Sequence, residues 1–416
     1  MDGHELLPNL FRTEYRKIIA VLCATFGIDH VEIAEDIVAD TFLSATELWG
    51  TKGLPENPTA WLYTVAKNKT RNHLKRTSLF ANTITPALRN DLPVSEEPSI
   101  DLTEERIRDS QLAMIFTVCD PRIPVEAQVA LALNLLCGFG VQEVADAFLI
   151  TREAAYKRLH RGKERLRSER IRIEQPEAHE LDDRLPAVLT TLYLLFSEGY
   201  YSSSTNTILR KDLCGEAMRL AYLLVQNETT NLPVVNALLS LMCFHASRFD
   251  ARFSANGDVV LYGDQDVGLW DMELVRMGEH FLNQASTGSN LSKYHLEAGI
   301  AYWHTHKDDT TEKWESILQL YNRLLQIEYS PVAALNRTYA LAKANGYEQA
   351  IVEAEKLDLT ANHLYHCLLG HLYVDIDRTM ALHHFDIALS MTTSDMERQV
   401  IVQQMDAIVP TWNSPP

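Results

Sequence analysis

The chain has 416 residues, of which 46% are hydrophobic, and its formal net charge is -18. This composition excludes an intrinsically disordered chain and provides for two or three domains with buried cores. The charge is uneven, because residues 1–172 hold 22 basic and 24 acidic residues whereas residues 173–416 hold 16 and 32. The acidic total therefore does not exclude an anion-binding surface in the N-terminal part.

The cysteine pattern and the hydrophobicity profile predict a cytoplasmic protein. The six cysteines are scattered and show no CxxC spacing, which is typical of reduced core residues. The N-terminal residues lack the charged-then-apolar layout of a signal peptide, and the most apolar run, residues 129–141, is too short to span a bilayer. We expect a soluble chain that does not bind a membrane.

Residues 8–50 are predicted to form two helices. In the first, apolar residues between Leu10 and Leu22 share one face, and Gly27 ends the segment. In the second, five apolar side chains are expected to face inward: Ile33, Ile37, Phe42, Leu43 and Leu48. The outer face of the second helix is an acidic strip formed by Glu32, Glu35, Asp36, Asp40 and Glu47. Taken alone, such a strip is most often an ordinary solvated surface.

Residues 60–76 combine aromatic and basic side chains in one predicted helix. Trp61 and Tyr63 precede a run with five Lys or Arg residues, and no acidic residue interrupts the segment up to Phe80. This charge suits a phosphate backbone, and aromatic rings beside it can stack on unpaired bases. Taken alone, Trp61 and Tyr63 are more often core residues than platforms for bases.

The following segment, residues 81–107, is predicted to be a flexible linker because it contains three prolines and drifts toward acidic composition. Helical periodicity resumes near Asp109 and continues to Arg172. Residues 1–80 and 108–172 are thus expected to form two small helical domains, each with one basic helix.

Residues 140–172 predict a short helix, a tight turn and a longer basic helix, which is typical of a DNA-reading helix-turn-helix. Thr151 suits the N-cap of the longer helix. The buried stripe of that helix is expected to comprise Ala155, Leu159, Gly162 and Leu166. Residues 151–172 hold nine basic and three acidic residues. A solvated basic helix is the alternative interpretation of this charge.

The order of these segments resembles that of bacterial sigma factors of the extracytoplasmic-function type, which carry only regions 2 and 4. The resemblance rests on AEDIVADTFLSA, on PTAWLYTVAKNKTRNHLKR and on EAQVALALNLLCGFGVQEVADAFLITREAAYKRLHRGKERLR, and it covers residues 8–172. It implies that the chain binds core RNA polymerase, promoter double-stranded DNA and the melted strand of the -10 element.

The resemblance also implies roles for individual residues. Contact with polymerase would involve Asp36, Asp40 and Phe42. Contact with the -10 element would involve Trp61, Lys67, Asn68, Arg71, Asn72, Lys75 and Arg76. Contact with the major groove of the -35 element would involve Arg152, Glu153, Tyr156, Lys157, His160 and Arg161, since Arg and Lys side chains pair with guanine edges.

The remainder, residues 173–416, is predicted to be helical, which makes the whole chain all-α. Only residues 255–266 read as non-helical, with Asn256 and Gly257 at a hairpin turn. From about residue 292 the segments pair as helical hairpins: 292–306 with 311–327, 331–344 with 347–356, and 362–374 with 378–391. Tyr339 and Tyr373 lie 34 residues apart in matching contexts, which is the tetratricopeptide period.

The strings LYLLFSEGY, DLCGEAMRL and GDQDVGLWD resemble the C-terminal extension of one subgroup of these sigma factors, in which a helical-repeat domain follows region 4. This resemblance implies a fused regulatory domain in residues 173–416. Such a domain would contact a protein partner or another part of the same chain.

An enzyme is the less favoured reading of the C-terminal half. Glu198, Asp264 and Asp266 with His245 are the materials of a carboxylate site, and the pairs His363 with His366 and His383 with His384 are the materials of a metal site. Neither histidine pair has a third ligand or an HExxH motif, and the chain has no phosphate-cradling glycine loop and no nucleophile elbow. We expect no catalytic residue, metal or cofactor.

Two functions remain open at this point. The first is a promoter-recognition subunit that directs core RNA polymerase to specific -10 and -35 elements. The second is a one-component helix-turn-helix regulator with a protein-sensing repeat domain, independent of polymerase. The acidic helix and the tryptophan-basic helix favour the first, because a simple repressor has no use for them.

Overall fold

The computed structural model describes residues 3–84, 100–200, 207–254, 259–392 and 395–408. These residues form eighteen α-helices and no β-strand, apart from an isolated antiparallel bridge between Phe253 and Val259. The predicted all-α class is confirmed. The chain divides into two compact units: unit 1 comprises residues 1–199 and 208–229, and unit 2 comprises residues 200–207 and 230–416.

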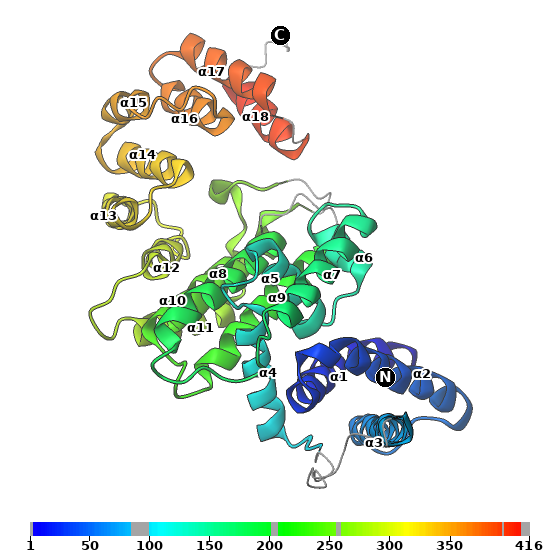
Figure 1. Ribbon diagram of the computed structural model, residues 1–416. Helices are drawn as coiled ribbons and strands as arrows, with labels where there is room; N and C mark the ends of the chain where they lie inside the picture. Colours follow the sequence, from blue (N-terminus) through cyan, green and yellow to red (C-terminus); the bar gives the residue numbers. More distant parts are fainter. Residues whose placement is uncertain (1–2, 85–99, 201–206, 255–258, 393–394, 409–416) are drawn as a thin grey trace. The chain divides into compact units, whose positions relative to one another are not determined.

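Unit 1 begins with three helices, α1 (Gly3–Phe26), α2 (Val31–Lys52) and α3 (Pro58–Ile84), which are drawn in blue in Figure 1. The chain turns between α1 and α2 at Gly27, whose φ of 87° is a conformation that other residues rarely adopt. The prediction for the inner face of α2 was partly wrong, because Leu43 is 57% exposed and Leu48 is 40% exposed. Helix α2 therefore presents leucine side chains beside its acidic residues.

Four further helices follow: α4 (Glu104–Val118), α5 (Val125–Leu131), α6 (Val141–Ala147) and α7 (Arg152–Ser168). Thr151 caps α7, since its Oγ1 accepts a hydrogen bond of 3.2 Å from the Ala154 amide. The buried residues of α7 are the predicted stripe, Ala155, Leu159, Gly162 and Leu166. A Cβ on Gly162 would lie 3.0 Å from Cδ1 of Leu131 in α5, so glycine allows these two helices to approach closely.

Helices α8 (Leu181–Tyr200) and α9 (Thr207–Val225) pack within unit 1. The Thr191 hydroxyl of α8 donates to Oε1 of the buried Gln128 at 2.7 Å. In α9, Glu216 forms an ion pair with the buried Arg16 of α1. The compact unit thus extends to Thr229, whereas the sequence places the start of the extension at residue 173.

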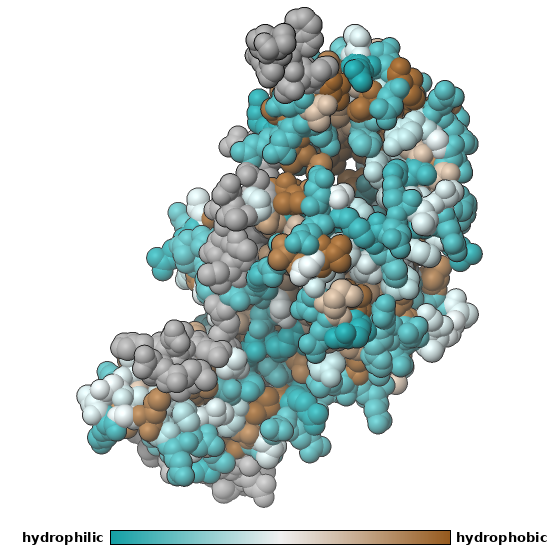
Figure 2. Space-filling model, turned by 180° about the vertical axis from the view of Figure 1, so that it is seen from behind, coloured by the Kyte–Doolittle hydropathy of each residue, from teal (hydrophilic) through white to brown (hydrophobic). Residues whose placement is uncertain are grey.

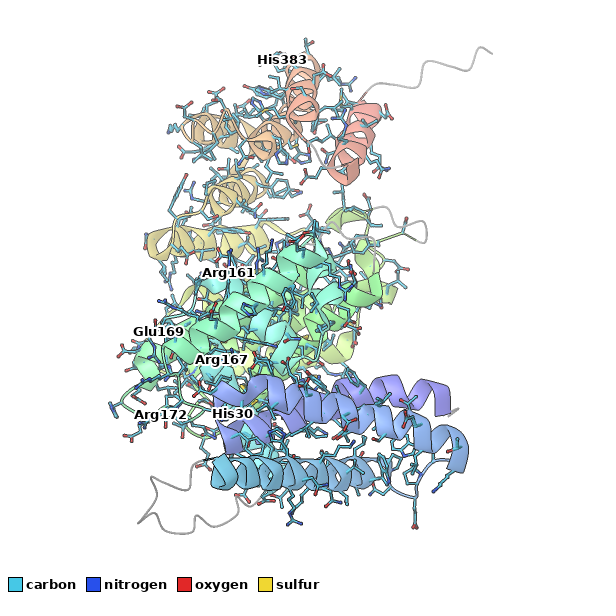
Figure 3. All side chains as sticks on the ribbon, turned by 45° about the vertical axis from the view of Figure 1, so that its right-hand side comes forward. His30, Arg161, Arg167, Glu169, Arg172 and His383 are labelled. Carbon is cyan, nitrogen blue, oxygen red and sulfur yellow. The ribbon has the colours of Figure 1, made fainter. Side chains whose placement is uncertain are left out.

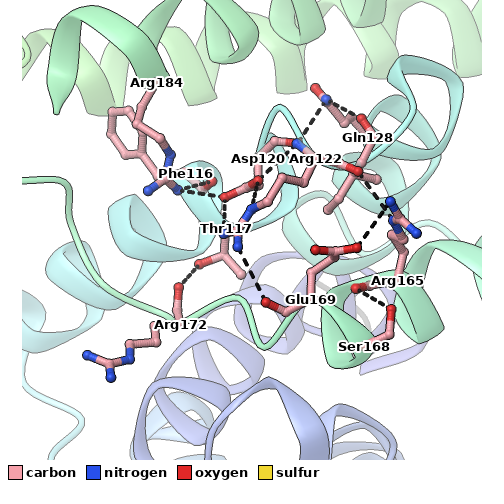
Figure 4. A network of polar contacts seen from close by, with 11 residues as sticks. Phe116, Thr117, Asp120, Arg122, Gln128, Arg165, Ser168, Glu169, Arg172 and Arg184 are labelled. Atoms are coloured by element: carbon pink, nitrogen blue, oxygen red, sulfur yellow. Dashed lines mark hydrogen bonds and ion pairs between the residues drawn. The ribbon is translucent and has the colours of Figure 1, made fainter.

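A polar network around Asp120 joins the segments near the end of α7 (Figure 4). The Asp120 carboxylate accepts hydrogen bonds from Arg122 at 2.8 and 2.9 Å, and Arg122 donates in turn to the Glu169 carbonyl at 3.3 Å. Arg184 of α8 donates to the Phe116 carbonyl at 2.9 Å. Burial raises the pKa of Asp120, but the hydrogen bonds from Arg122 outweigh this effect and hold the pKa below its ordinary value.

Unit 2 contains the helices α10 (Pro233–Ala246), α11 (Met272–Ala285), α12 (Lys293–Trp303), α13 (Thr311–Ile327), α14 (Pro331–Asn345), α15 (Tyr347–Glu355), α16 (His363–Tyr373), α17 (Arg378–Met391) and α18 (Asp395–Ile408). From α12 to α17 the bounds agree with the predicted hairpins to within a few residues. Helices α12 to α16 share one apolar core that includes Trp314 and Leu369. Phe385 and Ile401 belong to a second core formed with α17 and α18.

The segment predicted as a hairpin, residues 255–266, contains one 3₁₀ turn, Tyr262–Asp264, and a second, Val267–Leu269, follows the segment directly. Asp266 caps the second turn, because its Oδ1 accepts a 2.8 Å hydrogen bond from the Gly268 amide. The predicted turn residues, Asn256 and Gly257, lie outside the described residues.

The face of the molecule drawn in Figure 2 is mostly hydrophilic. On the face drawn in Figure 2, hydrophobic residues form small patches separated by hydrophilic ones. None of the described helices is long and apolar enough to cross a membrane.

Candidate nucleic-acid interface

One face of α7 presents the side chains that the sequence predicted for the -35 element. All six are exposed: Arg152, Glu153, Tyr156, Lys157, His160 and Arg161. The Tyr156 and His160 rings lie 6.1 Å apart, and Lys157 forms a 2.6 Å ion pair with Glu153 one turn earlier. The helix therefore displays cations and planar rings along a single face, while the opposite face is buried in unit 1.

The connection between α6 and α7 holds α7 in a defined position. Leu149 adopts a left-handed conformation with φ of 51° and is 62% exposed, and the Ile150 amide donates to the Ala145 carbonyl at 3.0 Å. The guanidinium of Arg158 lies 4.7 Å from the centroid of the Phe148 ring. Arg158 thus packs back on the turn and differs from the exposed cations of the same helix.

Helix α3 has a buried face and a polar face. Leu62, Ala66 and Thr70 are fully buried. Among the residues predicted for the -10 element, Asn68, Arg71 and Asn72 are exposed, whereas Trp61 and Lys67 are partly buried. The Trp61 ring packs edge-on against Trp49 of α2, with 5.4 Å between ring centroids. The side chains of Lys75 and Arg76 lie outside the described residues.

The predicted polymerase residues on α2 differ in exposure. Asp36 and Asp40 are exposed, and Asp40 forms an ion pair with Lys69 of α3. Phe42 is only 4% exposed, and its ring packs edge-on against Phe11 of α1 at 4.9 Å between centroids. The Phe42 side chain therefore belongs to the core of the three N-terminal helices, and its contribution to polymerase binding stays a prediction.

Helix α2 instead presents an acidic and apolar face. Asp36, Asp40, Leu43 and Glu47 are all exposed, and their spacing of four, three and four residues places them along one side of the helix. Helical periodicity could not identify Leu43 as exposed, because its position in the helix is compatible with either face. An exposed leucine between carboxylates is a feature of a protein-binding surface more than of a solvated strip.

The C-terminal half of α7 contacts α2 within unit 1. Nζ of Lys163 lies 2.6 and 2.7 Å from the two carboxylate oxygens of Glu35, and Arg167 forms an ion pair with Glu32. Figure 3 shows Arg167 on the side of α7 that faces the N-terminal helices, near His30, while Arg161 lies farther from them. Two acidic residues of the predicted strip are therefore engaged by α7.

A partly buried contact also fixes α3 against α1. The Tyr63 hydroxyl donates to Oε2 of Glu14 at 2.5 Å. Burial, followed by this hydrogen bond, raises the pKa of Tyr63 well above its ordinary value. Tyr63 is therefore a neutral structural residue that orients α3, in agreement with the core alternative for this side chain.

Most of the cysteines are buried, and two histidines contact each other. All six cysteines are free thiols, five of them buried, and burial raises the pKa of Cys119 to about 12. His366 and His384 approach within 3.1 Å through their Nδ1 atoms, which is a pairing that the sequence analysis did not name. No group of three His, Cys, Asp or Glu residues within the described ranges is placed to hold a metal ion.

Two family models match the chain. Residues 10–79 match sigma-70 region 2, which corresponds to α1, α2 and most of α3. Residues 184–286 match a family of unknown function, DUF6596. The N-terminal part of the chain, residues 10–79, is therefore similar to region 2 of sigma-70 factors.

One relative is similar to the chain over nearly its whole length. An uncharacterised protein from Rhizobium meliloti (strain 1021) is 33% identical over 382 residues, which cover 91% of this chain and 90% of the relative. The chain belongs to the same family as this protein. No solved structure matches the chain.

Proposed function

We propose that the chain is an initiation factor of the extracytoplasmic-function type, in which α2 binds polymerase, α3 binds the -10 element and α7 binds the -35 element. The observation that carries this proposal is the match of residues 10–79 to sigma-70 region 2. The exposed basic face of α7 in the same compact unit supports it, since a polymerase-bound factor needs a second DNA contact upstream.

The geometry of α7 supports its proposed role at the -35 element. An α-helix fits the major groove of B-DNA, and Arg or Lys side chains form bidentate contacts with guanine there. Arg152, Lys157 and Arg161 are exposed on one face of α7, whereas Leu159 is buried on the other. This arrangement allows the basic face to enter a groove while the apolar face keeps the helix fixed to unit 1.

The role of α3 rests on its polar face. Asn68, Arg71 and Asn72 are exposed beside Lys67 and offer hydrogen-bond donors to phosphates and unpaired bases. The contact of Trp61 with Trp49 leaves its ring partly accessible at the start of the helix. In the proposed complex Trp61 supports the edge of the melted DNA, and the asparagines contact the exposed strand.

The role of α2 rests on the face formed by Asp36, Asp40, Leu43 and Glu47. Leu43 supplies apolar area, and the carboxylates supply the charge that selects a basic partner surface. Phe42 supports this face from behind through its contact with Phe11. We propose that this face docks on core RNA polymerase in the cytoplasm.

Unit 2 completes the proposal as a fused regulatory domain with tetratricopeptide-like hairpins. The consecutive pairing of α12 to α17 and the recurrence of tyrosine at positions 339 and 373 support this class. In this proposal, unit 2 receives a signal and modulates the activity of unit 1.

The affinity of the full chain for core RNA polymerase tests the assignment of α2. Asp36→Lys and Leu43→Ser are expected to weaken binding at least about tenfold each, because both remove a contact from the proposed surface. Glu56→Lys is the matched control, since Glu56 is also exposed but lies outside α2. Fluorescence anisotropy with labelled protein measures the effect, and wild-type affinity for both variants would contradict the proposal.

A further inference from the structure

Unit 2 contains a cavity of about 650 Å³ whose walls come from the segment that follows α10, the 3₁₀ turn at Tyr262–Asp264, the connection between α12 and α13, and the helices α13, α14, α16 and α18. This volume lies within the range of sites for small organic ligands, about 300–1,000 Å³. The walls combine cationic groups with aromatic rings, a composition that differs from the rest of the unit.

The cavity concentrates positive charge in an acidic part of the chain. Residues 230–416 hold 12 basic and 23 acidic residues, yet four of the 12 line this cavity: Arg248, Lys307, Lys313 and Lys343. Asp309 is the one carboxylate among the described residues that line it. This carboxylate is already engaged, because it accepts hydrogen bonds from Lys343 at 2.6 Å and from the Trp314 indole. The walls therefore carry an excess of three positive charges.

Arg248 is the strongest indication of a ligand. Its side chain is buried, with 8% of the residue exposed, and its Nε has no hydrogen-bond partner. Its guanidinium lies 5.4 Å from the centroid of the Tyr262 ring, which stabilises the cation without neutralising it. A buried cation without a counterion is costly, so its position beside a cavity indicates that an anion completes the site.

A second polar atom without a partner lines the same cavity. Nδ1 of His304 is buried and has no hydrogen-bond partner. Burial, with the nearby Arg248 and Lys313, lowers the pKa of His304 to about 3, so the imidazole is neutral near pH 7. A neutral imidazole beside Arg248 can hydrogen-bond a ligand without adding charge.

Lys307 and Lys313 are held in place by hydrogen bonds to uncharged groups. Nζ of Lys307 donates to the carbonyls of Gln265 at 2.8 Å and Tyr262 at 3.0 Å. Nζ of Lys313 donates to the His306 carbonyl at 2.5 Å and to the Tyr262 hydroxyl at 3.0 Å. Carbonyl and hydroxyl oxygens satisfy the ammonium hydrogens but do not cancel their charge, so the site is pre-organised for an anion.

The aromatic walls indicate what the anion is attached to. Tyr262, Trp314 and Tyr339 line the cavity, and the Trp314 and Tyr339 rings pack edge-on at 5.5 Å between centroids. Flat apolar surfaces beside a cationic cluster suit a ligand with a planar apolar body. We propose that this cavity binds a small organic anion that carries a carboxylate or phosphate on a planar apolar body.

Isothermal titration of the full chain tests this site with four probes: benzoate, phenyl phosphate, inorganic phosphate and the neutral benzyl alcohol. We expect benzoate or phenyl phosphate to bind, and the tighter of the two identifies the preferred anion. Benzyl alcohol lacks the charge and inorganic phosphate lacks the ring, so both should bind at least about tenfold more weakly. Equal binding of either control, or binding of neither aryl anion below about 10 mM, would overturn the proposal.

Variants link the binding to the cavity. Arg248→Gln is expected to lower the affinity for the preferred aryl anion at least about tenfold, and Arg276→Gln, on the exposed face of α11, should leave it unchanged. Lys343 is more exposed than Arg248, so Lys343→Gln should give a smaller loss of affinity. This second variant keeps the test valid if Arg248→Gln lowers the stability of the fold. Thermal melting reports the folding of each variant. Wild-type affinity in both cavity variants would overturn the assignment, and this outcome is independent of DNA or polymerase binding.

Discussion

The molecule carries two cation-rich sites that differ in enclosure. On α7 the cations are exposed along one face of a single helix, whereas in unit 2 Arg248 and Lys313 are buried in a cavity lined by rings. A long polyanion such as duplex DNA fits the open face and cannot enter a cavity of about 650 Å³. A small anion gains little from exposed charges in water but much from charges in a desolvated site. Enclosure, more than charge, decides which anion each site can select.

The largest predicted effect concerns the part of the chain that unit 1 needs for its stability. A chain that ends at Arg172 loses α8 and α9, and with them the Thr191 hydroxyl that donates to Oε1 of Gln128 and the Glu216 carboxylate that pairs with Arg16. We expect a loss of more than about 5 kcal/mol in the free energy of unfolding of unit 1, because several buried contacts are removed together. Chemical denaturation measures it.

The matched control for this truncation ends at Thr229, which keeps the complete unit 1. This longer fragment should unfold cooperatively and bind promoter DNA without the cavity. Equal stability of the two fragments would show that α8 and α9 are not part of the DNA-binding unit.

Substitutions on α7 test the open site. Lys157→Ala or Arg161→Ala should weaken binding to the promoter by about 1–3 kcal/mol each if the side chain contacts a base edge. The ion pair of Lys157 with Glu153 is exposed, so its loss should hardly change stability. Arg276→Ala in α11 is the control, and electrophoretic mobility shift with a labelled promoter fragment is the measurement. Unchanged binding in both α7 variants would remove this helix from its role.

Acid pH tests the enclosed site. The pKa of His304 is about 3 in the folded chain and near its ordinary value of 6.5 in the unfolded chain. Between these values only the unfolded chain binds this proton, so the free energy of unfolding falls as pH falls, by up to about 1.4 kcal/mol per pH unit. The contribution is complete above pH 6.5. His304→Gln should flatten the slope between pH 6.5 and 5, and the exposed His280→Gln should not. Identical slopes would place His304 in a solvated environment.

Substitutions at an ion pair inside unit 1 test whether Lys163 of α7 stabilises the fold, in contrast to the exposed cations that we assign to DNA binding. The side chains of Lys163 and Glu35 are 14% and 20% exposed, so their pair is partly buried. Lys163→Glu or Glu35→Lys should destabilise unit 1 by about 1–2 kcal/mol, and the double swap should restore most of this loss. A double-mutant cycle by urea denaturation measures the coupling. Additive effects without recovery would mean that the pair contributes nothing.

The smallest predicted effect concerns the turn that positions α7. Leu149 has a positive φ and an exposed side chain, so it is strained without compensating burial. Leu149→Gly should stabilise unit 1 by about 0.5–1 kcal/mol, as measured by thermal and urea denaturation, because glycine adopts this conformation without a steric cost. Lower stability of this variant would show that the leucine side chain makes a contact that matters.

Local features of α7 and of the helices in unit 2 could be predicted from the sequence. The buried stripe of α7 and the Thr151 cap follow from helical spacing, and so do the helices from residue 292 onward. Phe42 and Leu43 are adjacent apolar residues near the border of two helix faces, so periodicity could not decide that the phenylalanine is buried and the leucine exposed. The difference depends on the ring of Phe11, which comes from another helix.

Contacts between distant segments could not be predicted. Lys163 and Glu35 lie 128 residues apart, and no local pattern connects them. The cavity in unit 2 could be predicted from the sequence even less, because Arg248, Lys313 and Lys343 are single cations in separate segments of an acidic region. A run of basic residues shows an open site in the sequence, whereas an enclosed site appears only when the fold brings scattered residues together.

Run-off transcription with purified core RNA polymerase tests whether unit 1 uses its open basic face as part of a polymerase-bound initiation factor. We expect that the full chain makes core enzyme initiate at a specific promoter, and that Arg161→Ala lowers this activity. A chain that binds the same DNA alone but never stimulates initiation by core enzyme would contradict it.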